Sequence, residues 1–223
     1  MEKIIQKRIN SVIHSNNILL NTQFGFRSGH STNHQLLRVT KHIKENLKNG
    51  KSTGMLTFDV EKAFDGVWHK ALLHKMFLLK FPLQLIKIIK SFLFNRSFYV
   101  SVGNEKSNSF QIVAGVPQGS VLSPILYNIF TSDLKIPTNT CEVALFADDT
   151  AFYYSHKKPA KIISQLNCAS KYLAEYCTKW KIKLNAAKTQ ATFFTRRRCV
   201  KMLPTDEVSI LNTTIPWKSE LKY

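Results

Sequence analysis

The stretch of sequence that decides the fold is Phe146-Ala147-Asp148-Asp149. It stands between two largely apolar runs, Glu142–Phe146 and Thr150–Tyr154, which have the length and composition of short β-strands. Two strands joined this closely predict a hairpin with both aspartates at its tip. Adjacent carboxylates that are partly buried resist ionisation unless a cation compensates their charge. A solvated Asp-rich turn is the alternative interpretation, and the pair alone does not exclude it, since aspartate is common in turns.

A third aspartate, Asp59, ends a short apolar run upstream of the pair. Residues 55–60 are predicted to form a strand and residues 61–80 a helix that follows at once. A site that joins Asp59 to the aspartate pair must therefore be assembled by tertiary folding. The alternative role for Asp59 is that of an N-cap for the following helix. Asp65 would lie on that helix, where it would only cap it or pair with Lys62 or His69.

A glycine-proline loop, Gly115-Val116-Pro117-Gln118-Gly119-Ser120, leads into an apolar stretch with helical spacing. Two glycines around a proline let backbone N–H groups approach a ligand closely, and the helix that follows would point its N-terminus at the loop. This geometry suits a phosphate, a base or a template backbone. A sharp turn from strand to helix is the plainer interpretation.

Elsewhere the sequence alternates between helical and strand patterns. Helices are predicted over residues 2–20, from Ser31 or Thr32 to Lys48, from Pro82 to Leu93, and over residues 160–181. A hairpin is predicted from residues 98–103 and 110–113, and a strand over residues 191–195. Mixed helices and short antiparallel strands define the α+β class.

The charge balance favours a polyanionic partner. The 223 residues include 32 Lys and Arg against 14 acidic residues, which gives a net charge of +18. Nucleic acid is the leading candidate, because no basic amphipathic helix or membrane span is recognisable. Arg196-Arg197-Arg198 with Lys201 would hold a nucleic-acid backbone, or would simply form a solvated face. The four cysteines show no metal-binding spacing and no secretory signal precedes them, which predicts reduced thiols in an intracellular protein of the nucleus, the cytoplasm or both.

Taken in order, these segments resemble polymerase motifs A, B and C. The matching stretches are Phe58–Asp65, Gly115–Pro124 and Phe146–Asp149, and they closely resemble reverse transcriptases of non-LTR (LINE-type) retrotransposons, the jockey-like insect elements in particular. Gln23–Thr32 looks like the fingers motif of that family, and Leu184–Thr189 resembles its motif D, with Ala186 where proline is usual. The resemblance runs from end to end.

The resemblance implies a right-hand polymerase palm, an antiparallel sheet backed by helices. Residues 1–54 would be partial fingers, 55–80 the palm with motif A, 81–113 a palm–fingers connection with the hairpin, and 114–223 the palm with motifs B, C and D. The chain would open partway into the fingers, without the family's upstream Arg-Pro-Ile segment, and stop at Leu221–Tyr223 with the thumb absent. It is therefore expected to be a fragment, without an endonuclease domain.

The resemblance also implies a metal site. Asp59, Asp148 and Asp149, with the backbone carbonyl of Val60, would hold two Mg²⁺ ions, with Mn²⁺ as a possible substitute. Mg²⁺ prefers such oxygen ligands together with substrate phosphates. Two ions would activate the primer 3′-hydroxyl and stabilise the pyrophosphate leaving group.

Further residues receive substrate roles by the same resemblance. Phe64 would be the steric gate that rejects a 2′-hydroxyl, although a core phenylalanine is the plainer interpretation. Gln118 would contact the incoming nucleotide or the template, and Gly119 would keep the approach open. Arg27 would neutralise phosphate or clamp the template, and Lys188 would act as an acid or charge partner for the pyrophosphate, each against the alternative of a solvated basic residue.

The function implied is an RNA-directed DNA polymerase that uses an RNA template, a DNA primer and deoxynucleoside triphosphates, without a membrane and in an undefined oligomeric state. Two alternatives stay open. An RNA-dependent RNA polymerase shares the palm, but Phe64 at the gate and Ala147 in place of the usual glycine argue against it. A catalytically inactive nucleic-acid-binding remnant fits a chain cut at both ends, and weak or undetectable extension by this chain alone is expected.

Overall fold

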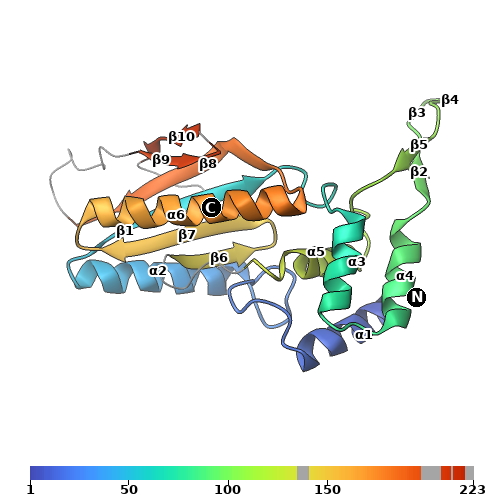
Figure 1. The fold of residues 1–223 in the computed structure, drawn as a ribbon, viewed down its shortest axis with the longest axis horizontal. Coiled ribbons are helices and arrows are strands. Elements are labelled where there is room, and N and C mark those ends of the chain that lie inside the picture. The colour runs from blue at the N-terminus through green and yellow to red at the C-terminus, as the bar shows by residue number, and fades with distance from the viewer. Residues whose placement is uncertain (135–140, 197–206, 212, 219–223) are drawn as a thin grey trace. The chain divides into compact units, whose positions relative to one another are not determined.

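The computed structural model describes residues 1–134, 141–196, 207–211 and 213–218 (Figure 1). The chain divides into two compact units. The first, called here the helical unit, comprises Met1–Leu20 and Lys62–Asp133. The second, the sheet unit, comprises Asn21–Glu61 and Leu134–Tyr223. Each unit is built from two separate stretches of chain, and each is described below by itself.

The sheet unit is built on a five-stranded sheet with the order β11-β8-β1-β7-β6. The strands are β1 (Ser52–Val60), β6 (Glu142–Phe146), β7 (Asp149–His156), β8 (Leu184–Phe194) and β11 (Trp217–Lys218). The central strand β1 pairs antiparallel with both β7 and β8, and β7 pairs antiparallel with β6. Only the short β11 lies parallel to its neighbour. A small ribbon, β9 (Val208–Ile210) with β10 (Thr213–Ile215), completes the described strands of this unit.

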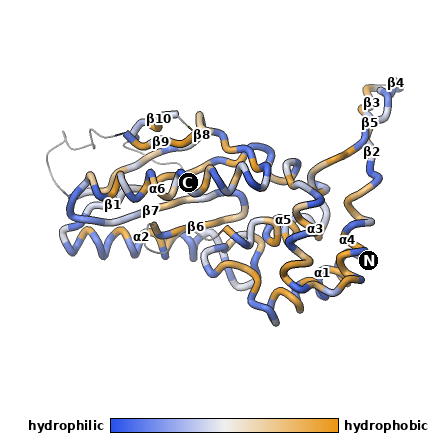
Figure 2. The backbone as a smooth tube through the Cα atoms, in the orientation of Figure 1, coloured by the Kyte–Doolittle hydropathy of each residue, from blue (hydrophilic) through white to orange (hydrophobic). Residues whose placement is uncertain are grey.

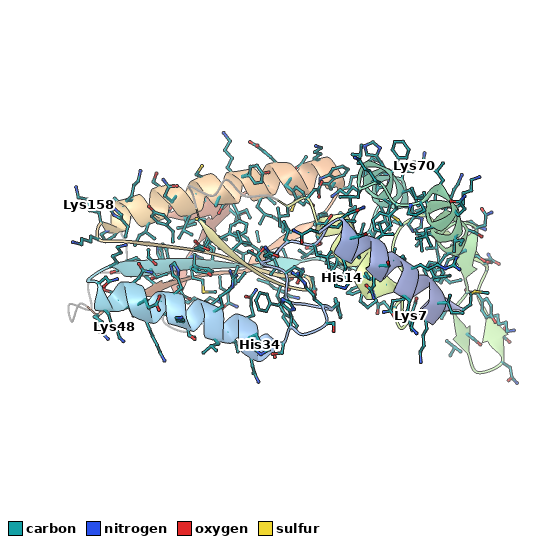
Figure 3. All side chains as sticks on the ribbon, turned by 90° about the horizontal axis from the view of Figure 1, so that it is seen from below. Lys7, His14, His34, Lys48, Lys70 and Lys158 are labelled. Carbon is teal, nitrogen blue, oxygen red and sulfur yellow. The ribbon has the colours of Figure 1, made fainter. Side chains whose placement is uncertain are left out.

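Two helices cover the opposite faces of this sheet, α2 (Thr32–Lys48) and α6 (Pro159–Trp180) (Figure 3). Figure 2 shows hydrophobic and hydrophilic residues alternating along both helices, as expected for helices that bury one side. Val39 and Ile43 of α2 pack with Met55, Ala144 and Tyr153 of the sheet. Burial on both faces explains why nearly all residues of β1 are buried, rather than every second one.

The helical unit contains α1 (Glu2–Ser15), α3 (His69–Leu78), α4 (Leu83–Leu93) and α5 (Ser123–Thr131). A strand ribbon follows α4, in which β2 (Arg96–Phe98) pairs with β5 (Phe110–Ile112) and β3 (Ser101–Val102) with β4 (Glu105–Lys106). The core of the unit is largely apolar, and its largest fully buried side chains are Ile9, Leu72, Met76, Ile89, Leu93, Leu122, Leu126, Ile129 and Phe130.

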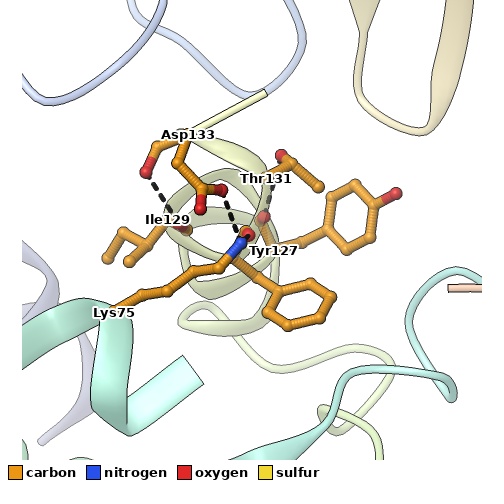
Figure 4. Close-up of polar contacts among 7 residues, drawn as sticks. Lys75, Tyr127, Ile129, Thr131 and Asp133 are labelled. Carbon is orange, nitrogen blue, oxygen red and sulfur yellow. Dashed lines mark hydrogen bonds and ion pairs between the residues drawn. The ribbon is translucent and has the colours of Figure 1, made fainter. Parts of the chain in front are cut away.

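A buried lysine joins α3 to the end of α5 (Figure 4). The side chain of Lys75 is only 3% exposed, and its Nζ donates to the carbonyl of Phe130 and to Oδ1 of Asp133. The ammonium group also lies 4.9 Å from the centre of the Phe130 ring. A buried charge is tolerated only with such partners, so this contact fixes how the two helices pack.

The predicted α+β class is confirmed, together with most of the predicted elements. Helix α2 begins at Thr32 as predicted, because the Ser31 side chain accepts a hydrogen bond from the His34 backbone N–H. The hairpin of β6 and β7, helix α6 and the ribbon before the glycine-proline loop are also present. Within the described residues, no helix combines the length and apolarity needed to cross a bilayer.

Several predicted boundaries were wrong. The helix predicted over residues 61–80 begins only at His69, because Glu61–Trp68 forms turns in which Lys62 takes a φ of 46°. Helix α1 stops at Ser15 rather than at residue 20, where Asn17 adopts a φ of 47°. Strand β8 runs from Leu184 instead of residue 191, since pairing with β1 extends it over a stretch with little apolar patterning.

Candidate active site

The aspartate pair lies on a tight turn between β6 and β7. Phe146 pairs with Asp149, so that Ala147 and Asp148 alone form the loop. Ala147 adopts a φ of 58°. Two-residue hairpin turns need such positive φ values and usually supply them with glycine or asparagine. An alanine in this left-handed region costs about 1–2 kcal/mol, so the surrounding structure must hold it there.

The loop at residues 21–31 lies directly against this turn. The backbone N–H of Phe24 donates to the Leu145 carbonyl at 2.9 Å, and the Leu145 N–H donates to the Thr22 carbonyl at 3.1 Å. A Cβ atom added to Gly25 would lie 2.0 Å from the Ala147 nitrogen. Glycine is therefore required at position 25, because the two backbones approach too closely for any side chain.

Asp59 reaches the same region from the end of β1. The pairing of β1 with β8 shifts register between Thr57 and Asp59, where β8 carries additional residues. This bulge brings Nζ of Lys188 to 3.6 Å from Oδ2 of Asp59. Strand bulges commonly re-aim side chains beside active sites in this way. Lys188 and Asp59, two of the predicted site residues, therefore lie side by side in the sheet unit.

A cavity of about 340 Å³ opens at this point, with Asp59, Asp149 and Lys188 among its lining residues. The remaining lining residues are Thr57, Phe58, Thr150, Ala187 and Gln190. The cavity is bounded by β1, β7 and the β8 bulge, so it belongs entirely to the sheet unit.

The three carboxylates influence one another electrostatically. Burial raises the pKa of Asp149 above its ordinary value, and the negative charges of Asp148 and Asp59 raise it further. Asp149 keeps an exposed surface, so solvent moderates this effect. A divalent cation would relieve the repulsion, and carboxylate oxygens are the ligands that Mg²⁺ prefers. Nowhere in the described part of the chain do three acidic, histidine or cysteine side chains already converge as ligands of one ion. The donor chemistry fits the metal, and binding would draw the carboxylates together.

The glycine-proline loop is bonded to the turn that follows β1 within the helical unit. The Val116 N–H donates to the Phe64 carbonyl at 2.9 Å, and the Gly115 N–H donates to the Val67 carbonyl at 2.8 Å. Nε2 of the buried His69 lies 2.6 Å from the Gly115 carbonyl oxygen. These bonds occupy carbonyls that a helix would use, which is the physical reason why the helix predicted from residue 61 does not form there.

Asp65 was wrongly predicted to lie on a helix. It lies in this turn, and its Oδ1 accepts a hydrogen bond of 3.0 Å from Nε2 of Gln118. Gly115 has a φ of 91°, and a Cβ atom there would lie 2.8 Å from the Asp65 carbonyl oxygen. Gly119 has a φ of 88°, with open space where a side chain would be. The half-buried ring of Phe64 stacks on Tyr127 with ring centres 5.3 Å apart.

The predicted site residues fall into the two units. The sheet unit carries Asp59, Val60, Asp148, Asp149, Lys188 and Arg27, and the helical unit carries Phe64, Gln118 and Gly119. The side chain of Arg27 is half-buried in the loop beside the aspartate turn. Arg196 is exposed, whereas Arg197, Arg198 and Lys201 of the predicted basic patch lie outside the described residues.

Sequence reasoning gave no role to two buried glutamines, Gln23 and Gln35, which hold the loop at residues 21–31. It also gave none to Glu2, whose carboxylate accepts hydrogen bonds from the Val121 N–H at 2.9 Å and the Ser120 hydroxyl at 2.8 Å. Gln23 in the loop and Gln35 on α2 are a weak signal, because other polar residues surround both in the sequence. Their partners are distant in sequence, so no local pattern identifies them.

Comparison with known proteins agrees with this geometry. A family profile described as "Reverse transcriptase (RNA-dependent DNA polymerase)" matches residues 1–223. The chain is 38% identical over 201 residues to a probable RNA-directed DNA polymerase from transposon BS of Drosophila melanogaster, covering 87% of this chain and 22% of that protein. It is also 38% identical over 204 residues to the RNA-directed DNA polymerase from mobile element jockey of the same species, covering 88% and 22%. The chain thus spans about a fifth of the length of these relatives.

Solved structures show the same fold at low sequence identity. Apo telomerase from Candida tropicalis, truncated from its C-terminal domain, aligns with a TM-score of 0.64 and 16% identity, over 96% of this chain and 42% of that one. Telomerase from Candida albicans, in complex with a fragment of telomeric RNA, aligns with a TM-score of 0.61 and 12% identity, over 85% and 34%. The predicted right-hand polymerase fold and the predicted resemblance to jockey-like elements are confirmed.

Proposed function

Because the chain belongs to the reverse transcriptase (RNA-dependent DNA polymerase) family, we propose that its sheet unit carries the nucleotidyl-transfer centre of a retrotransposon RNA-directed DNA polymerase. The observation that carries the proposal is that Asp59 and Asp149 line one cavity of the sheet unit together with Lys188. Asp149 is affected by the charges of both Asp148 and Asp59, although Asp59 comes from a different strand. Carboxylates gathered at one cavity are typical of a functional site, and the raised pKa of Asp149 fits that role.

In this proposal Asp59, Asp148 and Asp149 hold Mg²⁺, or Mn²⁺ in its place, together with the carbonyl of Val60. When bound, the two ions lower the pKa of the primer 3′-hydroxyl and neutralise charge on the leaving pyrophosphate. The carboxylates must be ionised to bind metal, and because burial and the neighbouring negative charges raise the pKa of Asp149, metal binding should weaken as the pH falls.

Lys188 is proposed to change partners during the reaction. Its Nζ lies beside Asp59 in the metal-free protein. A cation bound by Asp59 would repel this ammonium group, which would then be available to the pyrophosphate as a charge partner or acid. The exposed position of Lys188 on the β8 bulge permits that movement.

The substrate-binding roles proposed for the other residues follow from the family and from their local setting. Phe64, held against Tyr127, would exclude a 2′-hydroxyl and so select deoxynucleoside triphosphates. Gln118 is held by Asp65 near the open Gly119, and both would face the nucleotide or the template. Arg27 would contact a phosphate of the RNA template or the DNA primer.

Primer extension tests the proposal. The purified chain is supplied with an RNA template, a DNA primer and deoxynucleoside triphosphates, with Mg²⁺ or Mn²⁺, and compared with Asp148→Ala. We expect weak or undetectable extension by this chain, and any metal-dependent extension should fall to background in the variant. Extension that survives Asp148→Ala would contradict the proposed centre.

The same assay separates the two alternatives. Ribonucleotides incorporated as readily as deoxynucleotides would indicate an RNA polymerase, and Phe64→Ala should increase ribonucleotide use if the gate is correctly assigned. Binding of the primer–template duplex without any extension in either metal would indicate a non-catalytic nucleic-acid-binding protein.

A further inference from the structure

We propose that Gln23 is a positioning residue for the catalytic aspartates, because its buried carboxamide holds Ala147 in the left-handed conformation that directs Asp148 and Asp149. The inference rests on the proposed function of the aspartate turn. It concerns a residue that touches neither substrate nor metal, and that acts through the backbone immediately before Asp148.

The carboxamide of Gln23 engages both polar groups of one residue. Its Oε1 accepts a hydrogen bond of 3.0 Å from the Ala147 N–H, and its Nε2 donates one of 3.1 Å to the Ala147 carbonyl. Oε1 also accepts a bond of 2.8 Å from the Gly25 N–H. Gln23 is 3% exposed, so water does not compete for these partners.

Ala147 needs such a clamp because its conformation is unfavourable for an alanine. At a φ of 58° its Cβ atom crowds the backbone, and glycine is the usual residue at this point of a two-residue hairpin turn. The turn offers few bonds of its own, since the ladder between β6 and β7 ends at Phe146 and Asp149. Gln23 makes one hydrogen bond to the N–H and one to the carbonyl of the strained Ala147.

Gln23 is itself held in a rigid setting. Gln35 is fully buried, and its Nε2 donates to the Thr22 carbonyl at 3.0 Å and to the Leu145 carbonyl at 2.9 Å. Gly25 leaves no room for the loop to shift toward the turn. Because the loop is anchored on both sides of Gln23, the carboxamide acts as a fixed support rather than as a mobile contact. Supports of this kind behind metal ligands typically contribute about 10–100-fold to metal affinity or activity.

The decisive variant is Gln23→Met, which keeps the length of the side chain and removes its hydrogen bonds. Mn²⁺ titration followed by electron paramagnetic resonance measures metal affinity independently of turnover, and Asp148→Ala identifies the site that is titrated. We expect Gln23→Met to weaken Mn²⁺ binding about 10-fold or more. We also expect a decrease in kcat that is larger than any change in KM. Ser52→Ala serves as the control, because it removes a buried side-chain hydrogen bond to Thr195 in the same unit, at the opposite end of β1 from Asp59.

A double-mutant cycle with Ala147→Gly tests the mechanism itself. Glycine adopts a positive φ without support, so the loss caused by Gln23→Met should shrink to less than about 3-fold in the Ala147→Gly background. Gln23→Glu is the second variant if Gln23→Met does not fold. It keeps the shape and the acceptor but loses the donor to the Ala147 carbonyl, and its added negative charge alone would favour Mn²⁺. A loss of affinity is expected nonetheless.

The outcomes separate this inference from the proposed function. A wild-type chain without Asp148-dependent Mn²⁺ binding contradicts the proposed function and the positioning role that depends on it. Wild-type binding with an unchanged Gln23→Met variant contradicts the positioning role alone. So does an equal loss of Mn²⁺ affinity in Ser52→Ala, or a Gln23→Met loss that persists in full with Gly at position 147.

Discussion

At the residue scale, ionisation of the Asp149 carboxyl group affects both the stability of the fold and the proposed metal binding. Its pKa is raised in the folded, metal-free chain by burial and by the charges of Asp148 and Asp59. The folded state therefore binds this proton more tightly than the unfolded state does. Stability from this group is fully present below the ordinary carboxyl pKa and is lost as the pH rises through the raised value.

Asp149→Asn is consequently expected to stabilise the metal-free chain at neutral pH. The amide removes the repulsion that the ionised carboxylate suffers, so the difference from wild type should disappear below the ordinary carboxyl pKa. Urea unfolding across a pH series, without divalent cations, measures this difference. Adding Mg²⁺ should stabilise wild type and leave the variant nearly unchanged. A variant less stable than wild type at neutral pH without metal would contradict the electrostatic assignment.

At the scale of elements, the contact of α3 with α5 through Lys75 supplies a stability prediction. Asp133→Asn leaves a nearly buried ammonium without its counter-charge, although the Phe130 carbonyl remains a partner. Asp133 is 40% exposed, so water replaces part of the lost interaction. We expect a loss of about 1–3 kcal/mol in the free energy of unfolding, measured by urea denaturation.

The exposed pair Lys41–Glu45 on α2 is the matched control for that measurement. Both side chains are mostly in solvent, and Glu45→Gln should change the free energy of unfolding by less than about 0.5 kcal/mol. Replacing Lys75 by Met together with Asp133→Asn should recover much of the loss, since no buried charge remains unpaired. Equal effects of Asp133→Asn and Glu45→Gln would show that burial of Lys75 does not matter.

Some of these elements can be predicted from local sequence signals, and others depend on contacts between residues distant in sequence. Helix α2 is predictable because its cap, Ser31, and its terminator, Asn49-Gly50, are local signals. The helix predicted from residue 61 fails because its carbonyls at Phe64 and Val67 bond to the glycine-proline loop, which is distant in sequence. The three aspartates are identifiable by their motifs, whereas the clamp of Gln23 on Ala147 spans 124 positions and leaves no local pattern.

At the scale of the whole molecule, the net charge of +18 dominates expected behaviour toward nucleic acid. Binding that neutralises phosphates releases counterions, so affinity for a primer–template duplex should fall at least about 10-fold between 50 and 200 mM salt. A fluorescence-anisotropy titration at several salt concentrations measures the slope. Asp148→Ala removes a negative charge without touching the basic surface, so its slope should match that of wild type. Salt-independent binding would show that the basic residues do not carry the interaction.

The division of the sheet unit into two separate stretches has a consequence for synthesis of the chain. Strand β1 is complete at Val60, but its partners β7 and β8 begin only at Asp149 and Leu184. At about 5–20 residues per second, a ribosome needs roughly 5–20 s to reach β7 after finishing β1. Throughout that interval the central strand β1 has no partner on either edge, and unpaired strand edges bind readily to other chains. The yield of soluble protein should therefore depend on how well the unpaired edges of the nascent β1 are shielded from other chains while the ribosome synthesises residues 62–133.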